Sequence, residues 1–198
     1  MNQTPAVAAV ILAAGAATRF GAPKQLAMYR GELLLARAIR HAREARVSHT
    51  IVVLGAYAET ILPAIGDLDN VVIVINDDWH TGIASSLRTG IAEAMTRSID
   101  GVLFMTIDQP LVDASVLSRL IDAFRTGRTI AAAEYDGVTG VPALIGREHL
   151  TDLARTVTGD RGAAGWLRSH DSSVTRVSLV REGIDVDTAE ALRAIEQV

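Results

Sequence analysis

The apolar residues of this chain fall into two kinds of run, and the two kinds alternate along the sequence. Residues 7–14 are apolar without any polar alternation, which is typical of a strand buried on both faces. Short runs of the same kind lie at 50–54, 71–75 and 101–105, and segments with apolar residues at helical spacing lie at 33–46, 57–65, 83–96 and 113–125. This alternation predicts an α/β fold, a Rossmann-like, mostly parallel sheet with helices on both faces.

The pattern changes after residue 125. Residues 130–135 and 141–145 read as two strands on either side of a tight turn at Asp136-Gly137, which predicts a small antiparallel excursion on the substrate side of the sheet. No linker rich in Pro, Gly or Ser separates this part from the rest. We therefore expect residues 1–198 to form a single domain, with an acceptor-side lobe at about 130–170.

Composition narrows the class of protein. The formal net charge is −4 and no Lys/Arg cluster is present, so we expect no nucleic-acid partner. There is no cysteine, which excludes disulfides and thiolate metal sites and is typical of a reducing compartment. The run at 7–14 is too short to cross a bilayer, and no basic residue precedes it, unlike in a signal peptide. We expect a cytoplasmic protein without a membrane partner.

The loop that follows the first strand is suited to phosphates. It consists of small residues and then presents Arg19 and Lys24. Small side chains let backbone N–H groups approach an oligophosphate, and two cations can neutralise its charge from different sides. The spacings of the P-loop and of the dinucleotide-binding fingerprint are both absent. The alternative is an ordinary strand–turn–helix corner whose basic side chains are simply solvated.

Aspartates at two places are candidate ligands of a divalent cation. Asp108 comes directly after an apolar strand, and the loops at 13–24, 76–86 and 106–110 should meet in one crevice at the carboxyl ends of the strands. Mg²⁺ takes one or two carboxylates together with phosphate oxygens and water, so Asp185 or Asp187 could complete the site. Asp187 has a second interpretation: with Glu190 three residues later, it resembles the capping box of a last helix.

Other polar residues have less specific signals. Gly82 precedes a predicted helix that carries hydroxyls at Ser85 and Ser86, which could contact a ribose, a base edge or a phosphate, or could simply cap the helix. The five histidines lack the spacing of a zinc site. The arginines of the helix at 33–46 are most simply a solvated face.

Three motifs together resemble a known family. They are Leu12-Ala13-Ala14-Gly15 followed by Arg19-Phe20-Gly21 and Lys24, then Ile107-Asp108-Gln109-Pro110, then Asp185-Val186-Asp187-Thr188. Over nearly the whole chain the sequence resembles the MobA-like nucleotidyltransferases of the molybdenum cofactor, and among them the cytidylyltransferases most. The resemblance implies a nucleotide-diphospho-sugar transferase type of fold. It also implies transfer of CMP from CTP to the terminal phosphate of molybdopterin, with release of pyrophosphate.

The resemblance also assigns roles to individual residues. It implies a Mg²⁺ ion, or alternatively Mn²⁺, held by Asp108 and Asp187, with Asp185 as the other candidate ligand. Lys24 would contact the α-phosphate and Arg19 the leaving pyrophosphate, so that Arg19, Lys24 and Asp108 form the catalytic set. The implied nucleotide-binding residues are Leu12, Ala13, Ala14, Gly15, Arg19, Lys24, Gly82 and Ser86.

The acceptor side departs from the family pattern. The resemblance places Gly140, Pro142 and Asp160 there, but Val141 stands where the family often has histidine and Ala164 where it often has arginine. Alternatives therefore stay open: GTP as the donor, a sugar phosphate or other phosphorylated acceptor, or a non-catalytic chaperone that carries nucleotide or cofactor to a target molybdoenzyme. An NAD(P)-dependent reductase is disfavoured by the missing fingerprint.

Overall fold

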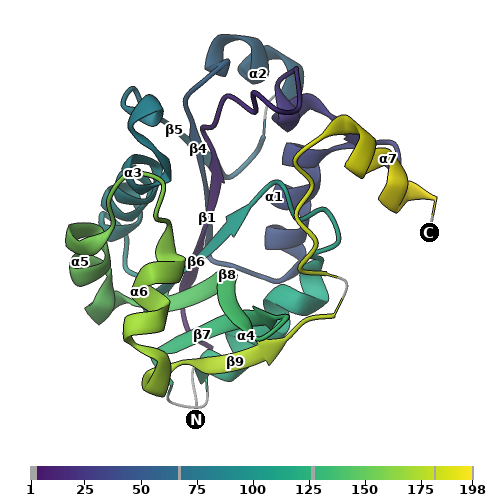
Figure 1. Ribbon diagram of the computed structural model, residues 1–198. Coiled ribbons are helices and arrows are strands. Elements are labelled where there is room, and N and C mark those ends of the chain that lie inside the picture. Colours follow the sequence, from purple (N-terminus) through teal and green to yellow (C-terminus); the bar gives the residue numbers. More distant parts are fainter. Residues whose placement is uncertain (1–3, 67, 126–127, 181, 198) are drawn as a thin grey trace.

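The protein, described here by a computed structural model at residues 4–66, 68–125, 128–180 and 182–197, is built on one large sheet (Figure 1). In the described part this sheet has seven strands in the order β5-β4-β1-β6-β8-β7-β9. Their bounds are β1 Val7–Ala13, β4 His49–Leu54, β5 Val71–Ile75, β6 Gly101–Thr106, β7 Ile130–Tyr135, β8 Val138–Gly146 and β9 Thr175–Ser178. The first four strands of the order run parallel, and β8 is antiparallel to both β6 and β7.

Helices cover both faces of the sheet, as Figure 1 shows. Their bounds are α1 Leu34–Glu44, α2 Ala58–Ile65, α3 Ile83–Met95, α4 Ala114–Arg125, α5 Arg147–Thr156, α6 Ala163–Ser169 and α7 Ala189–Glu196. Helices α1 and α4 pack on one face and α3, α5 and α6 on the other. Every residue of β1 is buried, because alternate side chains of this central strand enter the two opposite cores.

One of these helices lies unusually close to the sheet. A Cβ atom at Gly90 of α3 would stand 2.4 Å from Cγ1 of Val10 in β1 and 3.2 Å from Cγ2 of Val53 in β4. Only a residue without a side chain fits at this distance. This close approach holds α3 against β1 and β4.

A small third cluster lies beside the end of β6. Tyr29 comes from a short hairpin of β2 Met28–Tyr29 and β3 Glu32–Leu33, and it packs with Leu34, Val186 and Leu192. The segment before α7 reaches this cluster by returning past the end of β6, where the Val186 N–H donates to the Asp108 carbonyl at 2.7 Å. The C-terminal part of the chain therefore lies next to the loop that carries Asp108.

The predicted α/β fold is confirmed, with strand and helix bounds within a few residues of the expected ranges. The two strands predicted at 130–135 and 141–145 do form an antiparallel pair, β7 and β8. Because β8 also pairs with β6, this pair continues the main sheet. The strands β2, β3 and β9 and the helices α5 and α6 were not predicted from the sequence. Each of these strands has four residues or fewer, too few for a hydrophobic period to be seen.

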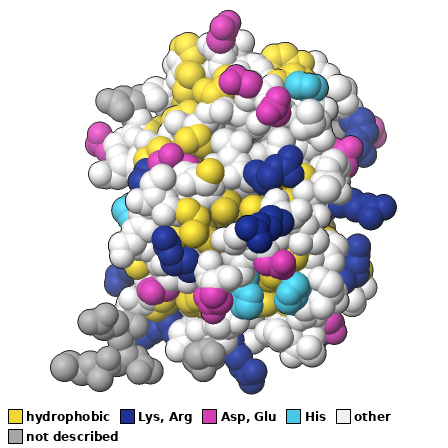
Figure 2. All heavy atoms as spheres, turned by 90° about the vertical axis from the view of Figure 1, so that its left-hand side faces the viewer, with side chains coloured by type: hydrophobic (Ala, Val, Ile, Leu, Met, Phe, Trp, Pro, Cys, Tyr) yellow, Lys and Arg dark blue, Asp and Glu magenta, His cyan; other side chains and the backbone are white. Residues whose placement is uncertain are grey.

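The surface carries charges of both signs. On the face seen in Figure 2, basic, acidic and hydrophobic side chains are intermingled. Within the described residues, no helix combines the length and the apolar character that crossing a membrane requires.

Candidate functional site

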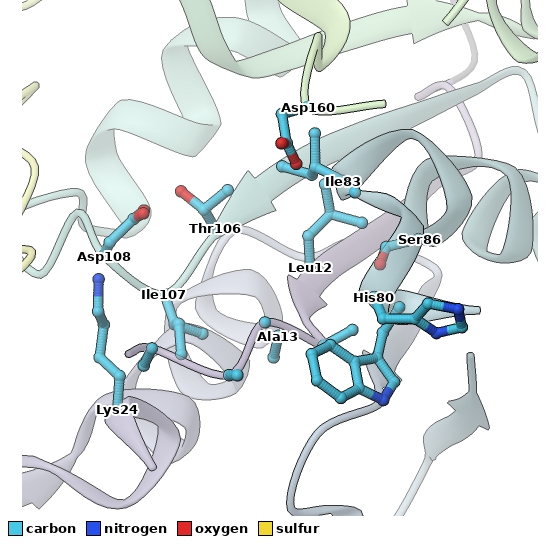
Figure 3. Close-up of a pocket in the computed structure, with 16 residues that line it drawn as sticks. Leu12, Ala13, Lys24, His80, Ile83, Ser86, Thr106, Ile107, Asp108 and Asp160 are labelled. Carbon is cyan, nitrogen blue, oxygen red and sulfur yellow. The ribbon is translucent and has the colours of Figure 1, made fainter. Parts of the chain in front are cut away.

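A cavity of about 380 Å³ opens at the carboxyl ends of β1 and β6. Figure 3 shows Lys24 and Asp108 at one end, His80 and Ser86 at the other, and Leu12 and Ala13 between them. The remaining lining residues are Ala14, Gly15, Ala16, Ala17, Trp79, Gly82, Ile83, Thr106, Ile107 and Asp160. The three loops that were expected to converge do meet here, as the crevice rule for open α/β sheets requires.

The loop after β1 is held by hydrogen bonds to its carbonyl groups. The amide Nε2 of Gln25, which is 1% exposed, donates to the carbonyl of Ala13 at 2.6 Å and to that of Gly15 at 3.2 Å. The Ala56 N–H donates to the Ala14 carbonyl at 2.9 Å. Three successive carbonyls are therefore bound on the protein side, and the loop is rigid where it borders the cavity. Sequence reasoning missed Gln25, although it directly follows Lys24.

Lys24 and Arg19 share one carboxylate. Lys24 begins the 3₁₀ turn Lys24–Leu26, and its Nζ donates to Oδ1 of Asp187 at 3.2 Å from a side chain that is 9% exposed. Arg19 pairs with Oδ2 of the same residue at 3.0 Å but is 75% exposed. Lys24 lines the cavity, whereas Arg19 and Asp187 do not, and Arg19 is connected to Lys24 through the Asp187 carboxylate.

Negative charge gathers around Asp108. Its Oδ1 atom is buried and has no hydrogen-bond partner among the described residues. Asp185 accepts a hydrogen bond from Nε2 of Gln109 at 3.0 Å. Desolvation raises the pKa of the Asp185 carboxyl, and so do the charges of Asp108 and Asp187, while the Gln109 hydrogen bond and the charge of Lys24 act in the opposite direction. Asp185 therefore lies close enough to Asp108 and to Asp187 to be affected by the charge of each.

This arrangement fits a hard divalent cation. A buried carboxylate oxygen without a donor is unfavourable, and a cation would give the Asp108 Oδ1 atom the partner that it lacks. Among the residues described, no three His, Cys, Asp or Glu side chains are placed to hold a metal ion. The protein would thus contribute no more than two such groups, and phosphate oxygens and water would complete the shell, as is usual for Mg²⁺.

The capping interpretation of Asp187 is wrong. The N-cap of α7 is Thr188, whose Oγ1 accepts from the Ala191 N–H at 3.1 Å. Asp187 instead points to Lys24 and Arg19. Its carboxylate is therefore engaged with the two basic residues, and the helix cap does not depend on it.

The start of α3 is held by other means than a serine cap. Ser85 and Ser86 lie inside the first turn, and both hydroxyls accept from Nδ2 of the buried Asn76, at 2.8 and 3.0 Å. The Ala84 N–H donates to the Gly159 carbonyl at 3.0 Å. Gly82 has φ +106°, and a Cβ there would stand 2.4 Å from the carbonyl carbon of Gly159. The helix start is thus built against the loop that carries Asp160.

The predicted acceptor-side residues are only partly brought together. Asp160 lines the cavity. Gly140 and Pro142 are buried in β8 and do not line it, and a Cβ at Gly140 would stand 2.8 Å from the hydroxyl of Tyr135. Sequence reasoning did not assign Thr106, His80 or Ile83 to the site, because nothing in their spacing distinguishes them from ordinary strand, loop and helix residues.

Comparison with known proteins identifies relatives over nearly the full length. Residues 9–174 match the family described as the MobA-like NTP transferase domain. The chain is 35% identical to the nicotine blue oxidoreductase of Paenarthrobacter nicotinovorans, with 95% of each chain covered. It is also 30% identical to the bifunctional protein GlmU of Kineococcus radiotolerans, over 98% of this chain but 39% of that protein.

Solved structures also include chains that match this one over nearly its full length. The crystal structure of Rv0371c from Mycobacterium tuberculosis H37Rv superimposes with a TM-score of 0.81 at 30% identity, covering 99% of this chain and 100% of that one. A second structure of Rv0371c is a complex with manganese, with a TM-score of 0.79 at 30% identity over 96% of this chain and 98% of that one. A nucleotidyl transferase from Methanothermobacter shares the fold, with a TM-score of 0.80 at 21% identity over 96% of each chain.

Proposed function

Because the chain belongs to the MobA-like NTP transferase family, we propose that it is a metal-dependent nucleotidyltransferase that uses CTP and passes CMP to a phosphorylated acceptor, molybdopterin first among the candidates. The single observation that carries this proposal is the presence of opposite charges at one end of the cavity. The nearly buried Lys24, which is paired with Asp187, lies at the same end as Asp108, whose buried Oδ1 atom has no hydrogen-bond partner among the described residues. A positively charged lysine and a carboxylate oxygen without a partner, at the same end of the cavity, are what the binding of a metal-bound triphosphate requires.

The reaction would be a displacement at phosphorus. An oxygen of the acceptor's terminal phosphate forms a bond to the α-phosphorus, the bond from that phosphorus to the bridging oxygen breaks, and pyrophosphate leaves with the electron pair. A phosphate monoester is already ionised at neutral pH and needs no general base. Catalysis then consists of positioning and of neutralising charge.

Each charged residue has a definite task in this scheme. Lys24 would hold the α-phosphate and neutralise the charge that develops there, and the exposed Arg19 would meet the leaving pyrophosphate. Asp108, with Asp187, would hold the divalent cation, which supplies charge neutralisation to the phosphate oxygens when bound. The manganese complex of the 30%-identical Rv0371c supports a divalent cation in this class of protein.

The opposite end of the cavity would receive the nucleoside. His80 and Ser86 lie there, and Trp79 also lines the wall. Aromatic rings and hydroxyls are suited to a base and a ribose. The preference for CTP over GTP rests on the resemblance of Asp108-Gln109-Pro110 to the cytidylyltransferase motif.

A screen of pyrophosphate release tests this proposal. The protein is incubated with Mg²⁺ or Mn²⁺ and each of the four nucleoside triphosphates, with molybdopterin or a panel of sugar phosphates as the acceptor. We expect release that requires metal, acceptor and a nucleoside triphosphate, and that is fastest with CTP. Release with GTP and molybdopterin would assign a guanylyltransferase, and release with a sugar phosphate alone would assign another acceptor.

A reductase is the second candidate, because the 35%-identical relative is named nicotine blue oxidoreductase. That name concerns the relative, and the dinucleotide fingerprint is absent from the present sequence. The two candidates are separated by incubation with NADH or NADPH and nicotine blue. Oxidation of the nicotinamide without any consumption of nucleoside triphosphate would favour the reductase.

A further inference from the structure

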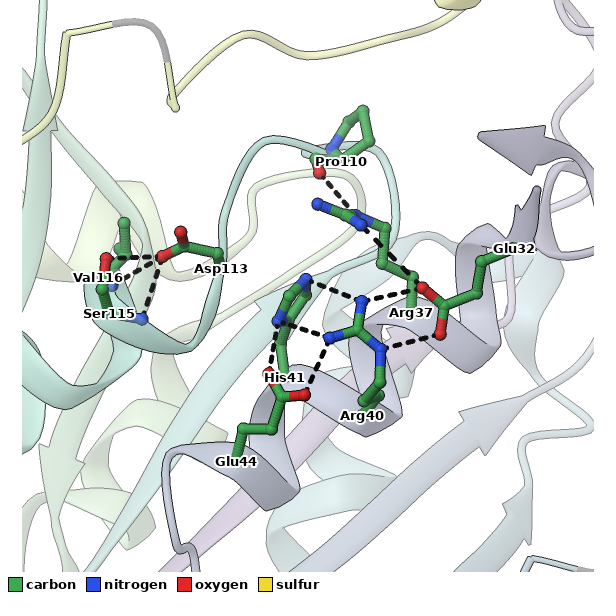
Figure 4. A network of polar contacts seen from close by, with 9 residues as sticks. All are labelled: Glu32, Arg37, Arg40, His41, Glu44, Pro110, Asp113, Ser115 and Val116. Carbon is green, nitrogen blue, oxygen red and sulfur yellow. Dashed lines mark hydrogen bonds and ion pairs between the residues drawn. The ribbon is translucent and has the colours of Figure 1, made fainter. Parts of the chain in front are cut away.

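One arginine of α1, Arg37, does not belong to the solvated face that the sequence predicts, whereas Arg43 is exposed. Arg37 is 16% exposed in its side chain, and its Nε donates to the carbonyl of Pro110 at 2.8 Å (Figure 4). Pro110 lies two residues after Asp108, so a residue of α1 is bonded to the loop that carries the candidate metal ligand. Arg37 also lines a small pocket together with Gln109 and Pro110, so its side chain lies directly against this loop.

The same guanidinium contacts a second part of the site. It lies over the ring of Tyr29 at 5.1 Å, a cation–π contact, and Tyr29 packs in the cluster with Val186. Val186 separates Asp185 from Asp187, and its N–H donates to the Asp108 carbonyl at 2.7 Å. Arg37 is therefore connected to both carboxylate-bearing segments, to one directly and to the other through Tyr29.

From these contacts we infer that Arg37 is a positioning residue, which fixes Asp108 and Asp187 relative to each other so that both can reach one divalent cation. It touches neither substrate nor cation and acts through the Pro110 carbonyl and the Tyr29 ring. The inference rests on the proposed function and deepens it. Loss of such an outer partner of a metal site typically weakens metal binding by about 10–100-fold.

The neighbouring Arg40 provides a matched control. It lies on the same helix and also binds Glu32, at 2.9 and 2.8 Å, and it binds Glu44 at 2.9 Å. Arg37 is 3.8 Å from the same carboxylate of Glu32. Replacing either arginine removes a contact with Glu32, but only the Arg37 replacement removes the contact with Pro110.

The test is a titration with Mn²⁺ alone, in which the free ion is measured by electron paramagnetic resonance well below the melting temperature. We expect Arg37→Gln to raise the Kd for Mn²⁺ by about 10–100-fold, and Arg40→Gln to leave it within about twofold. At saturating Mn²⁺ the kcat of Arg37→Gln should return to within a few-fold of the wild-type value. A merely structural role would lower the melting temperature of both variants without separating their metal affinities.

Arg37→Lys covers the case in which the glutamine variant does not fold. Lysine keeps the charge but cannot reach the Pro110 carbonyl and stack on Tyr29 with one planar group, so we expect an intermediate Kd. Equal Mn²⁺ affinity of the Arg37 and Arg40 variants, with wild-type binding intact, would overturn the inference alone. A wild-type protein that binds no Mn²⁺ and releases no pyrophosphate would overturn the proposed function, and this inference with it.

Discussion

Nζ of Lys24 lies 3.2 Å from Oδ1 of Asp187, so an ion pair joins residues 163 positions apart in the chain. It connects the loop after β1 to the segment before α7, and Arg19 occupies the second oxygen of the same carboxylate. Asp187 therefore holds both cations of the phosphate end in place before any ligand arrives. Such preorganised charge is the kind of arrangement that accelerates phosphoryl and nucleotidyl transfer.

The first prediction concerns Lys24. Lys24→Ala should lower kcat for pyrophosphate release by about 10²–10³-fold, because one preorganised donor to the reacting phosphate is lost. The melting temperature should change little, since Asp187 keeps Arg19 as a partner. Arg19→Ala is the control, and its effect should be smaller because that side chain is 75% exposed. A Lys24→Ala variant that keeps turnover within threefold of the wild type would remove Lys24 from the mechanism.

Two neighbouring residues should separate activity from stability. Asp187→Asn should abolish most of the activity, because a hard cation loses a charged ligand, while the helix cap stays in place. Thr188→Ala removes the cap at the start of α7 and should lower the free energy of unfolding by about 1 kcal/mol with activity unchanged. Urea unfolding and pyrophosphate release, measured on both variants, check this pair. The opposite result, an inactive Thr188→Ala with a fully active Asp187→Asn, would contradict the assignment.

Gly82 should tolerate no side chain. Its φ is +106° and a Cβ would stand 2.4 Å from the backbone of Gly159, so Gly82→Ala should lower the free energy of unfolding by more than about 1 kcal/mol. The displaced loop carries Asp160, so calorimetry should also find weaker CTP binding. The control is Gly165→Ala in α6, where the nearest neighbour of the new Cβ lies 3.9 Å away. Equal stability of the two alanine variants would contradict the close packing of Gly82.

Stability should depend on pH through His41. Burial lowers the pKa of His41 below its ordinary value of 6.5, and Arg37 and Arg40 lower it further, against a hydrogen bond and an ion pair with Glu44 that raise it. Between the lowered pKa of His41 in the folded protein and about pH 6.5, the unfolded chain binds more protons than the folded one. The contribution of the neutral His41 to the free energy of unfolding is therefore complete above about pH 6.5 and is lost as the pH falls through the lowered pKa. Figure 4 shows Asp113 accepting hydrogen bonds from Ser115 and from the Val116 N–H, and its charge also interacts with that of the His41 imidazole.

Urea unfolding between neutral pH and about pH 5.5 measures this dependence. His41→Gln should make the curve of stability against pH flatter, whereas the same change at the exposed His80 should leave it unchanged. Parallel curves for the wild type and His41→Gln would show that His41 is not the group responsible.

Local patterns in the sequence were enough to predict much of the fold and part of the site. The continuous apolar run of β1, the small residues after it and the aspartate after β6 are signals that lie within a few neighbouring residues. Lys24, Asp108, Leu12 to Gly15, Gly82 and Ser86 all line the cavity, as does Asp160. The choice between a cap and a site residue at Asp187 could not be made in this way, because its partners come from residues 19 and 24.

The residues that sequence reasoning missed act by binding backbone carbonyl groups. Gln25 binds backbone carbonyls, and Arg37 binds the carbonyl of a residue 73 positions away. Backbone carbonyls are present at every residue and carry no signal in the sequence. Amphipathic spacing identified α1 correctly but could not show that one arginine of its polar face turns inward to a loop.

The most direct test of the central claim is a crystal structure of the protein with Mn²⁺ and a non-hydrolysable CTP analogue. We predict the nucleotide in the cavity between β1 and α3, with its base near His80 and Ser86, its α-phosphate at Nζ of Lys24, and Mn²⁺ bound by Oδ1 of Asp108. A nucleotide bound elsewhere, or with its phosphates at the His80 end and Asp108 free of metal, would contradict the account.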